Sequence, residues 1–335
     1  MSLIDWGWNE FFAAELARCA VSGRPGRVIS DGRGAWRVAL ESGEAVLPAG
    51  PMSERPVAGD WVVSDPTASR IVHVLTRRTH LSRKKAGQEC GEQVLAANVD
   101  VLFIVAGLDG DFNLRRLERY LVLAEACGVA PVVVLNKCDL CEDAAARARE
   151  ADAVTAGAAP VLLLSALDRS SVMQLHRYIE PGQTAVLAGS SGAGKSTLVN
   201  ALLGADVQPT RDVRAGDSRG QHTTTARRLF RLDAGRLLID TPGLRELAPW
   251  ASAEAARSAF SDIDELASNC RFRDCAHHGE PGCAVADAVD PARLESYHKL
   301  RAELAYLERS QNIHLMQEEK RRWKIIHKAA RGFNR

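Results

Sequence analysis

Residues 189–197 form a glycine-rich loop whose residue types and spacing suit phosphate binding. They read Gly-Ser-Ser-Gly-Ala-Gly-Lys-Ser-Thr, a full match to the Walker A pattern, between an apolar run and a helical pattern. Backbone N–H groups in such a loop point at a phosphate chain, and the helix N-terminus favours negative charge. We expect Lys195 to reach the β- and γ-phosphates and Ser196 to ligate Mg²⁺. The predicted phosphate-binding residues are Gly189, Ser190, Ser191, Gly192, Ala193, Gly194, Lys195, Ser196 and Thr197.

Asp240 and Gly243 belong to a second segment with the chemistry of a Mg²⁺-dependent phosphate site. The segment Asp-Thr-Pro-Gly follows the run Arg-Leu-Leu-Ile over residues 236–239. In this position Asp240 would hold the Mg²⁺ shell, and the backbone N–H of Gly243 would sense the γ-phosphate.

A threonine-rich stretch, residues 220–225, lies in the loop between these two segments and reads Gly-Gln-His-Thr-Thr-Thr. A threonine hydroxyl here could complete the Mg²⁺ shell only when the γ-phosphate is present. We choose Thr224 as that ligand, with Thr223 and Thr225 as alternatives. An ordinary threonine-rich loop would have the same composition.

Two loops that follow apolar strands have the composition of a guanine site. Asn136-Lys137-Cys138-Asp139 follows one run and Ser165-Ala166 follows another. A carboxylate at Asp139 can accept hydrogen bonds from N1–H and N2–H₂ of guanine, whereas adenine has no N2 amine. Asn136 would brace the loops, the stem of Lys137 would cover the base, and the backbone N–H of Ala166 would meet O6. An ordinary polar turn is the alternative for the four-residue motif taken alone.

Three cysteines and a histidine cluster between residues 270 and 283. Cys270, Cys275, His277 and Cys283 can form a closed Cys₃His tetrahedron, which suits one structural Zn²⁺ and leaves no open catalytic position. His278 is the alternative imidazole, and buried thiols without a metal are the alternative to a metal site.

Alternating strands and helices are expected to position the nucleotide loops. Apolar runs at residues 101–105, 132–135 and 161–164 alternate with helical patterns such as 114–127, which predicts a parallel sheet with ligand loops at the strand ends. The guanine motifs precede the phosphate motifs, the reverse of an ordinary G domain. A circularly permuted chain can build the same sheet because termini and loops lie on the surface.

The N-terminal region predicts a small β-barrel, most plausibly an OB-fold, after a short amphipathic helix over residues 8–19. Glycines and prolines separate its short β-like runs, and such barrels often bind RNA, although a barrel used only for packing is equally consistent. The expected strands are residues 27–29, 35–40, 44–47, 60–63 and 70–74.

Composition places the chain among soluble globular proteins. It has 335 residues, 46% of them hydrophobic and 25% charged, with a net charge of +1. The sequence shows no apolar run of spanning length and no signal peptide, so we expect a cytoplasmic protein with no membrane partner, and a monomer. Basic stretches at residues 77–85 and 320–328 are the candidate RNA contacts, with solvated segments as the alternative.

The predicted organisation is multi-domain: an N-terminal OB-fold β-barrel, a central α/β circularly permuted P-loop G domain and a C-terminal α-helical zinc-binding domain. We divide the chain into an N-terminal extension (1–20), the barrel (21–78), a basic connector (79–98), the GTPase domain (99–248) and the zinc-binding helical domain with a basic tail (249–335).

Taken together, these motifs resemble the family of bacterial ribosome small-subunit-dependent GTPases called RsgA or YjeQ. The resemblance covers about residues 20–330 and rests on the barrel, the permuted motif order and the Cys-x4-Cys-x-His-x5-Cys cluster. It implies an enzyme that hydrolyses GTP to GDP and phosphate, acts late in maturation of the 30S subunit, binds 16S rRNA and is stimulated by the subunit. One departure is Gln221, where arginine is expected to be common in the family.

The residue that orients the attacking water is not where Ras-like proteins have it. They use a glutamine directly after the Asp-x-x-Gly motif, but Leu244 occupies that position here, so intrinsic hydrolysis should be slow. His222 is the nearest polar candidate, and we group it with Lys195 and Thr224 as catalytic. The alternative is that His222 packs the switch or touches rRNA while the subunit supplies the catalytic group.

Two other functional classes fit the same motifs. One is a GTP-dependent switch with a different partner, such as a metal-delivery or translation factor. The other is an RNA-binding scaffold that holds GTP without useful turnover.

Overall fold

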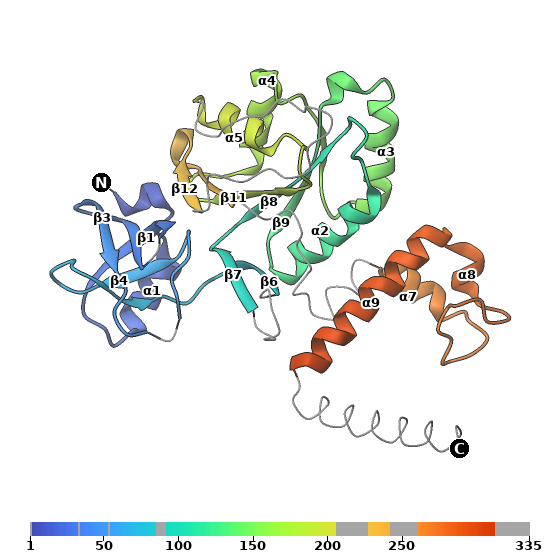
Figure 1. Ribbon diagram of the computed structural model, residues 1–335, viewed down its shortest axis with the longest axis horizontal. Coiled ribbons are helices and arrows are strands. Elements are labelled where there is room, and N and C mark those ends of the chain that lie inside the picture. The colour runs from blue at the N-terminus through green and yellow to red at the C-terminus, as the bar shows by residue number, and fades with distance from the viewer. Residues whose placement is uncertain are drawn as a thin grey trace, which may run out of the picture. The chain divides into compact units, whose positions relative to one another are not determined.

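The computed structural model (Figure 1) describes residues 2–32, 34–52, 54–84, 92–205, 227–241 and 260–311. The chain divides into two compact units, one of Met1–Arg83 with Gln93–Pro249 and one of Lys84–Glu92 with Trp250–Arg335. Each unit is described by itself. Among the described helices, none is long and apolar enough to cross a membrane.

The N-terminal part of the first unit is a five-stranded barrel. Strand β1 pairs with β2 and β4, β2 pairs with β3, and β4 pairs with β5. A bridge between Ala49 and Ile71 links the end of β3 to β5 and closes the barrel, as in a partly open OB-fold. The strands are β1 (Arg24–Asp31), β2 (Ala35–Leu40), β3 (Gly43–Pro48), β4 (Trp61–Ser64) and β5 (Ile71–Val74).

The segment before the barrel packs into the core of the first unit. It contains η1 (Leu3–Trp6) and α1 (Glu10–Arg18), and the Asn9 side chain caps α1 by accepting from the backbone N–H groups of its first turn. Trp6 and Phe12 are buried, and the ring of Trp8 lies 4.7 Å from that of Trp61. The predicted N-terminal extension is therefore part of the folded unit.

A mixed sheet forms the centre of the first unit, in the order β10-β9-β8-β11-β13-β12. Neighbouring strands are parallel except for β12, which runs antiparallel to β13. Long apolar runs suit such strands because helices bury both faces. The strands are β8 (Val101–Gly107), β9 (Ala130–Asn136), β10 (Val161–Leu163), β11 (Thr184–Gly189), β12 (Arg228–Arg231) and β13 (Leu237–Asp240).

Helices cover both faces of this sheet (Figure 1). Alternate residues of β8 point to opposite faces: Ile104 packs with Leu123 of α2 (Leu114–Ala126), and Phe103 packs with Leu198 of α5 (Lys195–Leu203). The remaining elements of this region are α3 (Ala144–Thr155), α4 (Arg169–Val172), and the short 3-10 turns η2 (Cys138–Leu140), η3 (Met173–Tyr178) and η4 (Asp233–Gly235).

The barrel and the central sheet share hydrogen-bonded strands. β1 pairs antiparallel with β12 at Ser30 and Arg228, so one sheet of eleven strands runs through both. Asp31 reinforces this seam by accepting from the backbone N–H of Arg227 at 3.1 Å and from its guanidinium at 3.2 Å. Within the predicted basic connector, β6 (His80–Lys84) and β7 (Glu92–Ala97) pair as a separate two-stranded sheet.

The second unit is helical in its described part. It contains α7 (Ser261–Ala267), α8 (Ala284–Ala288) and the long α9 (Pro291–Gln311). Phe260 and Tyr297 pack edge to face with ring centroids 5.4 Å apart, and Ile263, Val285 and Leu300 are buried. The cysteine-rich segment lies between α7 and α8.

Candidate functional site

The glycine-rich loop leaves the sheet from β11, whose six residues are all buried. Gly189 has φ +146°, and a Cβ there would lie 2.1 Å from the carbonyl oxygen of Val105. Gly194 has φ +90°, and a Cβ there would lie 2.2 Å from Nδ2 of Asn136. Both positions therefore require glycine, because any side chain would be strained and would collide with an adjacent strand end.

Helix α5 begins at Lys195 directly after this loop, as the Walker A pattern predicts. The Lys195 ammonium donates to the carbonyl oxygen of Gly189 at 2.8 Å and also to that of Ser190, so it lies inside the curve of the loop. Ser196 is exposed on the first turn of α5, whereas Ala193 is buried. The lysine is therefore next to the loop backbone, and the serine is accessible on the helix turn that follows the loop.

Asn136 ties the guanine-motif loops to the glycine-rich loop. Its side chain is fully buried at the end of β9. The amide Nδ2 donates to the carbonyl oxygen of Ala193 at 2.8 Å, and Oδ1 accepts from the backbone N–H of Ala166 at 2.9 Å. The carbonyl oxygen of Asn136 also accepts from the backbone N–H of Leu108 at 2.9 Å. One side chain and its own backbone therefore hold three strand-end loops together.

The next residues of the guanine motif reach the surface. Lys137 has φ +65°, an uncommon backbone conformation for a lysine, and it precedes the 3-10 turn that contains Asp139. The backbone N–H of Cys138 donates to the carbonyl oxygen of Leu164, which places this turn beside Ser165. Asp139 is exposed, so its carboxylate is open to a ligand at this edge of the sheet.

The loop after β8 contributes two carboxylates that the sequence motifs did not identify. Asp109 forms an ion pair with the ammonium of Lys137, and Asp111 accepts from the hydroxyl of Ser190. Arg116 in turn contacts Asp111 at 2.9 and 3.0 Å. The available signal was an Asp-Gly-Asp segment directly after a buried strand, since the carboxyl ends of parallel strands meet at one edge of the sheet.

The predicted Mg²⁺ ligands in the described part of the chain lie at the same edge. β11 and β13 are parallel neighbours with Val186 opposite Ile239, so Asp240 ends β13 beside the strand that leads to Ser196. A hydroxyl and a carboxylate oxygen are hard donors of the kind that Mg²⁺ prefers. The predicted residues His222, Thr223, Thr224, Thr225 and Gly243 lie outside the described residues.

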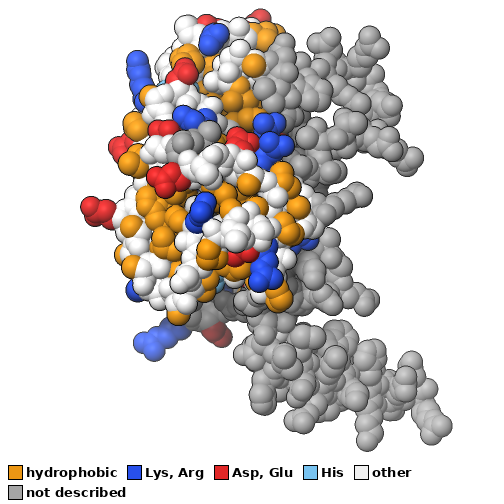
Figure 2. All heavy atoms as spheres, turned by 90° about the vertical axis from the view of Figure 1, so that its left-hand side faces the viewer, with side chains coloured by type: hydrophobic (Ala, Val, Ile, Leu, Met, Phe, Trp, Pro, Cys, Tyr) orange, Lys and Arg blue, Asp and Glu red, His pale blue; other side chains and the backbone are white. Residues whose placement is uncertain are grey.

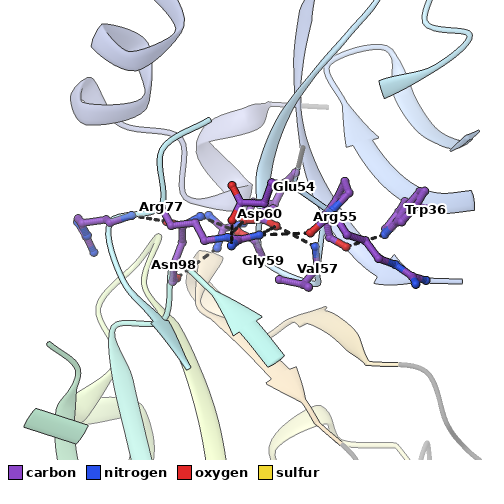
Figure 3. Close-up of polar contacts among 11 residues, drawn as sticks. Trp36, Glu54, Arg55, Val57, Gly59, Asp60, Arg77 and Asn98 are labelled. Carbon is purple, nitrogen blue, oxygen red and sulfur yellow. Dashed lines mark hydrogen bonds and ion pairs between the residues drawn. The ribbon is translucent and has the colours of Figure 1, made fainter. Parts of the chain in front are cut away.

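A buried polar network joins the barrel to the central sheet (Figure 3). The guanidinium of Arg77 donates to both oxygens of Asp60, at 2.7 and 2.8 Å, and Asp60 also accepts from the backbone N–H of Val57. Burial raises the pKa of Asp60, and the charge and hydrogen bonds of Arg77 act in the opposite direction. Asn98 donates to the carbonyl oxygen of Gly59 at 3.0 Å. The charge of Arg77 is therefore paired with Asp60 inside the fold.

Arg27 extends this network to the strand that carries the glycine-rich loop. It is buried and donates to Oγ1 of Thr184, the first residue of β11, at 3.1 Å and to the carbonyl oxygen of Asn98 at 3.4 Å. Its guanidinium lies 5.1 Å from the centroid of the Trp61 ring. Burial lowers the pKa of Arg27 to about 9, although the charge of Asp60 acts in the opposite direction. A barrel residue thus anchors the start of the nucleotide-site strand.

The predicted zinc ligands converge in the second unit. The ligand atoms of Cys270, Cys275, His277 and Cys283 all lie within 4.8 Å of one another. Nδ1 of His277 is 3.4 Å from Sγ of Cys283 and 3.7 Å from Sγ of Cys270, and those two sulfurs are 4.0 Å apart. A zinc tetrahedron has edges of about 3.8 Å between two sulfurs and about 3.6 Å between sulfur and nitrogen. Burial lowers the pKa of His277, which favours the neutral imidazole that a metal needs. The donor set fits structural zinc.

Comparison with known proteins gives matches over most of the chain. The RsgA GTPase family model matches residues 74–250. A small ribosomal subunit biogenesis GTPase RsgA from Methanosarcina acetivorans is 45% identical, over 95% of this chain and 89% of that protein. The protein of the same name from Xanthomonas oryzae pv. oryzae is 47% identical, over 89% and 84%.

Solved structures agree with these sequence matches. YjeQ from Thermotoga maritima superposes with a TM-score of 0.61 at 29% identity, over 84% of this chain and 98% of that one. YloQ, a circularly permuted GTPase, gives 0.56 at 24% identity, over 86% and 97%, and supports the fold alone. The permuted order of the strands, the convergence of base and phosphate loops at one sheet edge and the extent of these matches lead to one conclusion: the chain belongs to the RsgA family of circularly permuted GTPases.

Proposed function

We propose that this chain hydrolyses GTP to GDP and phosphate during late maturation of the 30S ribosomal subunit, and that the subunit stimulates hydrolysis. The observation that carries the nucleotide part is the pair of hydrogen bonds at the Asn136 side chain, which donates to Ala193 and accepts from Ala166 and so fixes the base loops against the phosphate loop. The small-subunit part is supported by relatives that are named small ribosomal subunit biogenesis GTPases.

Base recognition falls to the two strand-end loops. The exposed carboxylate of Asp139 accepts from N1–H and N2–H₂ of guanine. The backbone N–H of Ala166, which donates to Oδ1 of Asn136, would share or exchange that bond to donate to O6. Ser165 shapes the loop, and the stem of Lys137 covers one face of the base. Adenine would leave the carboxylate facing an acceptor, which is costly in a site that excludes water.

Phosphate binding falls to the glycine-rich loop and the helix that follows it. The backbone N–H groups of residues 189–197 surround the phosphates, and Lys195 exchanges its two carbonyl contacts for phosphate oxygens. Mg²⁺, which neutralises charge on the phosphates when bound, would be held by Ser196 and Asp240, with Thr224 completing the shell. Gly243 would sense the γ-phosphate through its backbone N–H.

The attacking water needs a residue to orient it, because Leu244 cannot form hydrogen bonds through its side chain. We assign this role to His222, whose imidazole can accept a proton from the water once the subunit docks the switch. Under this assignment, turnover would depend on the partner. The competing assignment gives the role to a group of the subunit.

Zinc serves a structural purpose in this proposal. Cys270, Cys275, His277 and Cys283 supply four ligands, so no coordination position remains for substrate. One ion per chain would fix the cysteine-rich segment between α7 and α8. The bounds of this domain (249–335), of the barrel (21–78) and of the GTPase domain (99–248) are part of the same proposal.

RNA contact is assigned to 16S rRNA through the barrel and the basic tail. On the barrel side of the first unit, positive and negative side chains are interspersed among hydrophobic ones (Figure 2). Arg77 and Arg78 are paired with Asp60 and Asp100, so they are poor candidates for RNA contacts. The concentrated positive charge of residues 83–85 and 320–328 is therefore the main electrostatic contribution. We infer a cytoplasmic monomer that binds the subunit.

The deciding experiment measures GTP hydrolysis by the full chain alone and with isolated 30S subunits, 50S subunits or free rRNA. Stimulation by 30S subunits alone supports the proposal. Equal turnover under all conditions would favour a switch with a different partner, and GTP binding without turnover would favour an RNA-binding scaffold.

A further inference from the structure

The loop that follows β8 is fixed at the edge of the nucleotide site. Its first residue, Leu108, donates from its backbone N–H to the carbonyl oxygen of Asn136 at 2.9 Å. Two residues before Asp109, Gly107 has no side chain, and a Cβ there would lie 2.6 Å from Oδ1 of Asp109 and 3.5 Å from Cα of Ala193. The carboxylate of Asp109 therefore occupies a space under the glycine-rich loop that a side chain at position 107 would fill.

From this place Asp109 holds the ammonium of Lys137. The two side chains form an ion pair and are only 27% and 18% exposed, respectively. Lys137 is also constrained from its own side, because its backbone has φ +65°. A lysine stem has high rotational freedom, and a fixed partner for the ammonium removes much of it before a ligand arrives.

We propose that Asp109 is a positioning residue for nucleotide binding: it holds Lys137 so that the lysine stem lies ready along one face of the guanine base. This inference rests on the proposed guanine site and adds a residue to it. Asp109 acts through Lys137, whereas the neighbouring Asp111 contacts Ser190 of the phosphate loop and Arg116.

For nucleotide affinity after Asp109 is neutralised, the proposal predicts the opposite of what simple electrostatics predicts. Removing a negative charge near the site should by itself tighten binding of an anionic nucleotide. Loss of the positioning contact should instead weaken it, and to the same extent for GTP and GDP, because the base and its covering stem do not change during hydrolysis. An interaction that is equally strong in the ground state and the transition state changes KM and leaves kcat unchanged.

The test is a double-mutant cycle in the full chain with Asp109→Asn, Lys137→Met and the double variant. Calorimetry measures GTP and GDP affinity, and 30S-stimulated hydrolysis gives KM and kcat. For Asp109→Asn we expect affinity for both nucleotides to fall about fivefold, the size of a partly screened ion pair. We expect KM to rise by a similar factor with kcat unchanged. In the Lys137→Met background only the general charge effect remains, so the Asp109→Asn change should no longer weaken binding.

Two additional variants separate positioning from general damage. Asp109→Glu keeps the negative charge, so its nucleotide affinity should lie between that of Asp109→Asn and that of the unmodified chain. Glu44→Gln breaks the exposed ion pair with Arg37 in the barrel and should leave nucleotide affinity unchanged.

The inference is overturned if Asp109→Asn tightens binding, leaves it unchanged, lowers kcat at constant KM, or weakens binding equally in both backgrounds. Failure of the proposed function looks different. In that case the unmodified chain would bind ATP as well as GTP or would not respond to 30S subunits.

Discussion

In the proposed site, guanine selectivity is assigned to the carboxylate of Asp139, which is exposed in the loop that follows its strand. Asp139→Asn replaces an acceptor with a mixed donor and acceptor, so GTP binding should weaken and the preference over ATP should relax. In the unmodified protein we expect discrimination of about a thousandfold or more, by analogy with other hydrogen-bonding pockets.

Competition binding with both nucleotides measures this preference. Glu142→Gln, at another exposed carboxylate three residues away, should leave it intact. Similar affinities of the unmodified chain for ATP and GTP would disprove the assignment of Asp139.

At the residue scale, the proposed role of His222 in turnover can be measured separately from nucleotide and subunit binding. His222→Ala removes the imidazole that we assign to water orientation, but it removes no proposed contact to the base or the β-phosphate. GTP affinity and 30S binding should stay close to normal, while stimulated turnover should be largely lost. Single-turnover hydrolysis with 30S subunits is the measurement, and full stimulation in the variant would assign the water to another group.

At the scale of elements, we expect the fold of the cysteine-rich segment to depend on a bound zinc ion. Zinc binding contributes directly to folding in small sites of this kind. Replacing Cys283, which also caps the start of α8, should therefore destabilise the second unit while GTP affinity of the full chain changes little. Metal analysis should find about one zinc per chain. Hydrogen exchange over residues 260–311 would report the loss, and a fully protected, metal-free protein would contradict the site.

A second prediction at the scale of elements concerns the stability of the joint between the barrel and the sheet, where Asp60 pairs with Arg77. Asp60→Ala leaves the guanidinium of Arg77 buried without its main partner, and such losses typically cost about 3–5 kcal/mol. Removing the exposed Arg37–Glu44 pair with Arg37→Ala should cost less than about 1 kcal/mol. Urea unfolding followed by tryptophan fluorescence compares the two, since Trp61 lies at this joint. Equal costs would mean that the joint contributes no more than a surface pair.

Sequence patterns predicted the elements that are governed by local rules. Buried parallel strands are continuous apolar runs, so residues 101–105 and 132–135 were correctly located within β8 and β9. The barrel, the permuted order and the cysteine cluster were also confirmed.

Features that depend on distant pairing were not visible in the sequence. Arg77 was grouped with a basic stretch that was interpreted as an RNA contact or a solvated segment, yet its side chain is only 8% exposed because Asp60 faces it across the joint. Arg27 and Thr184 are separated by 157 positions, and no local period reveals that they meet. Asp109 and Asp111 were missed because their partners come from other loops.

At the scale of the whole molecule, attraction to the subunit should come from concentrated charge in a nearly neutral chain. Replacing Lys320, Lys324 and Lys328 with glutamine should weaken 30S binding and lower its salt dependence, while GTP affinity stays the same. Binding measured over a range of salt concentrations gives the slope. An unchanged slope would show that the tail makes no phosphate contacts.

The pairing of β1 with β12 also affects how the protein can be divided. Deleting the first 78 residues would remove the strand that pairs with β12 at Arg228 and would leave this edge of the sheet uncovered, and exposed sheet edges recruit strands from other molecules. The same deletion would remove Trp6, Phe12 and Trp61 from the core that they share with the central sheet. The barrel thus covers this edge of the sheet in the intact chain, and we expect a fragment starting at residue 79 to aggregate even though it would keep every nucleotide-binding motif.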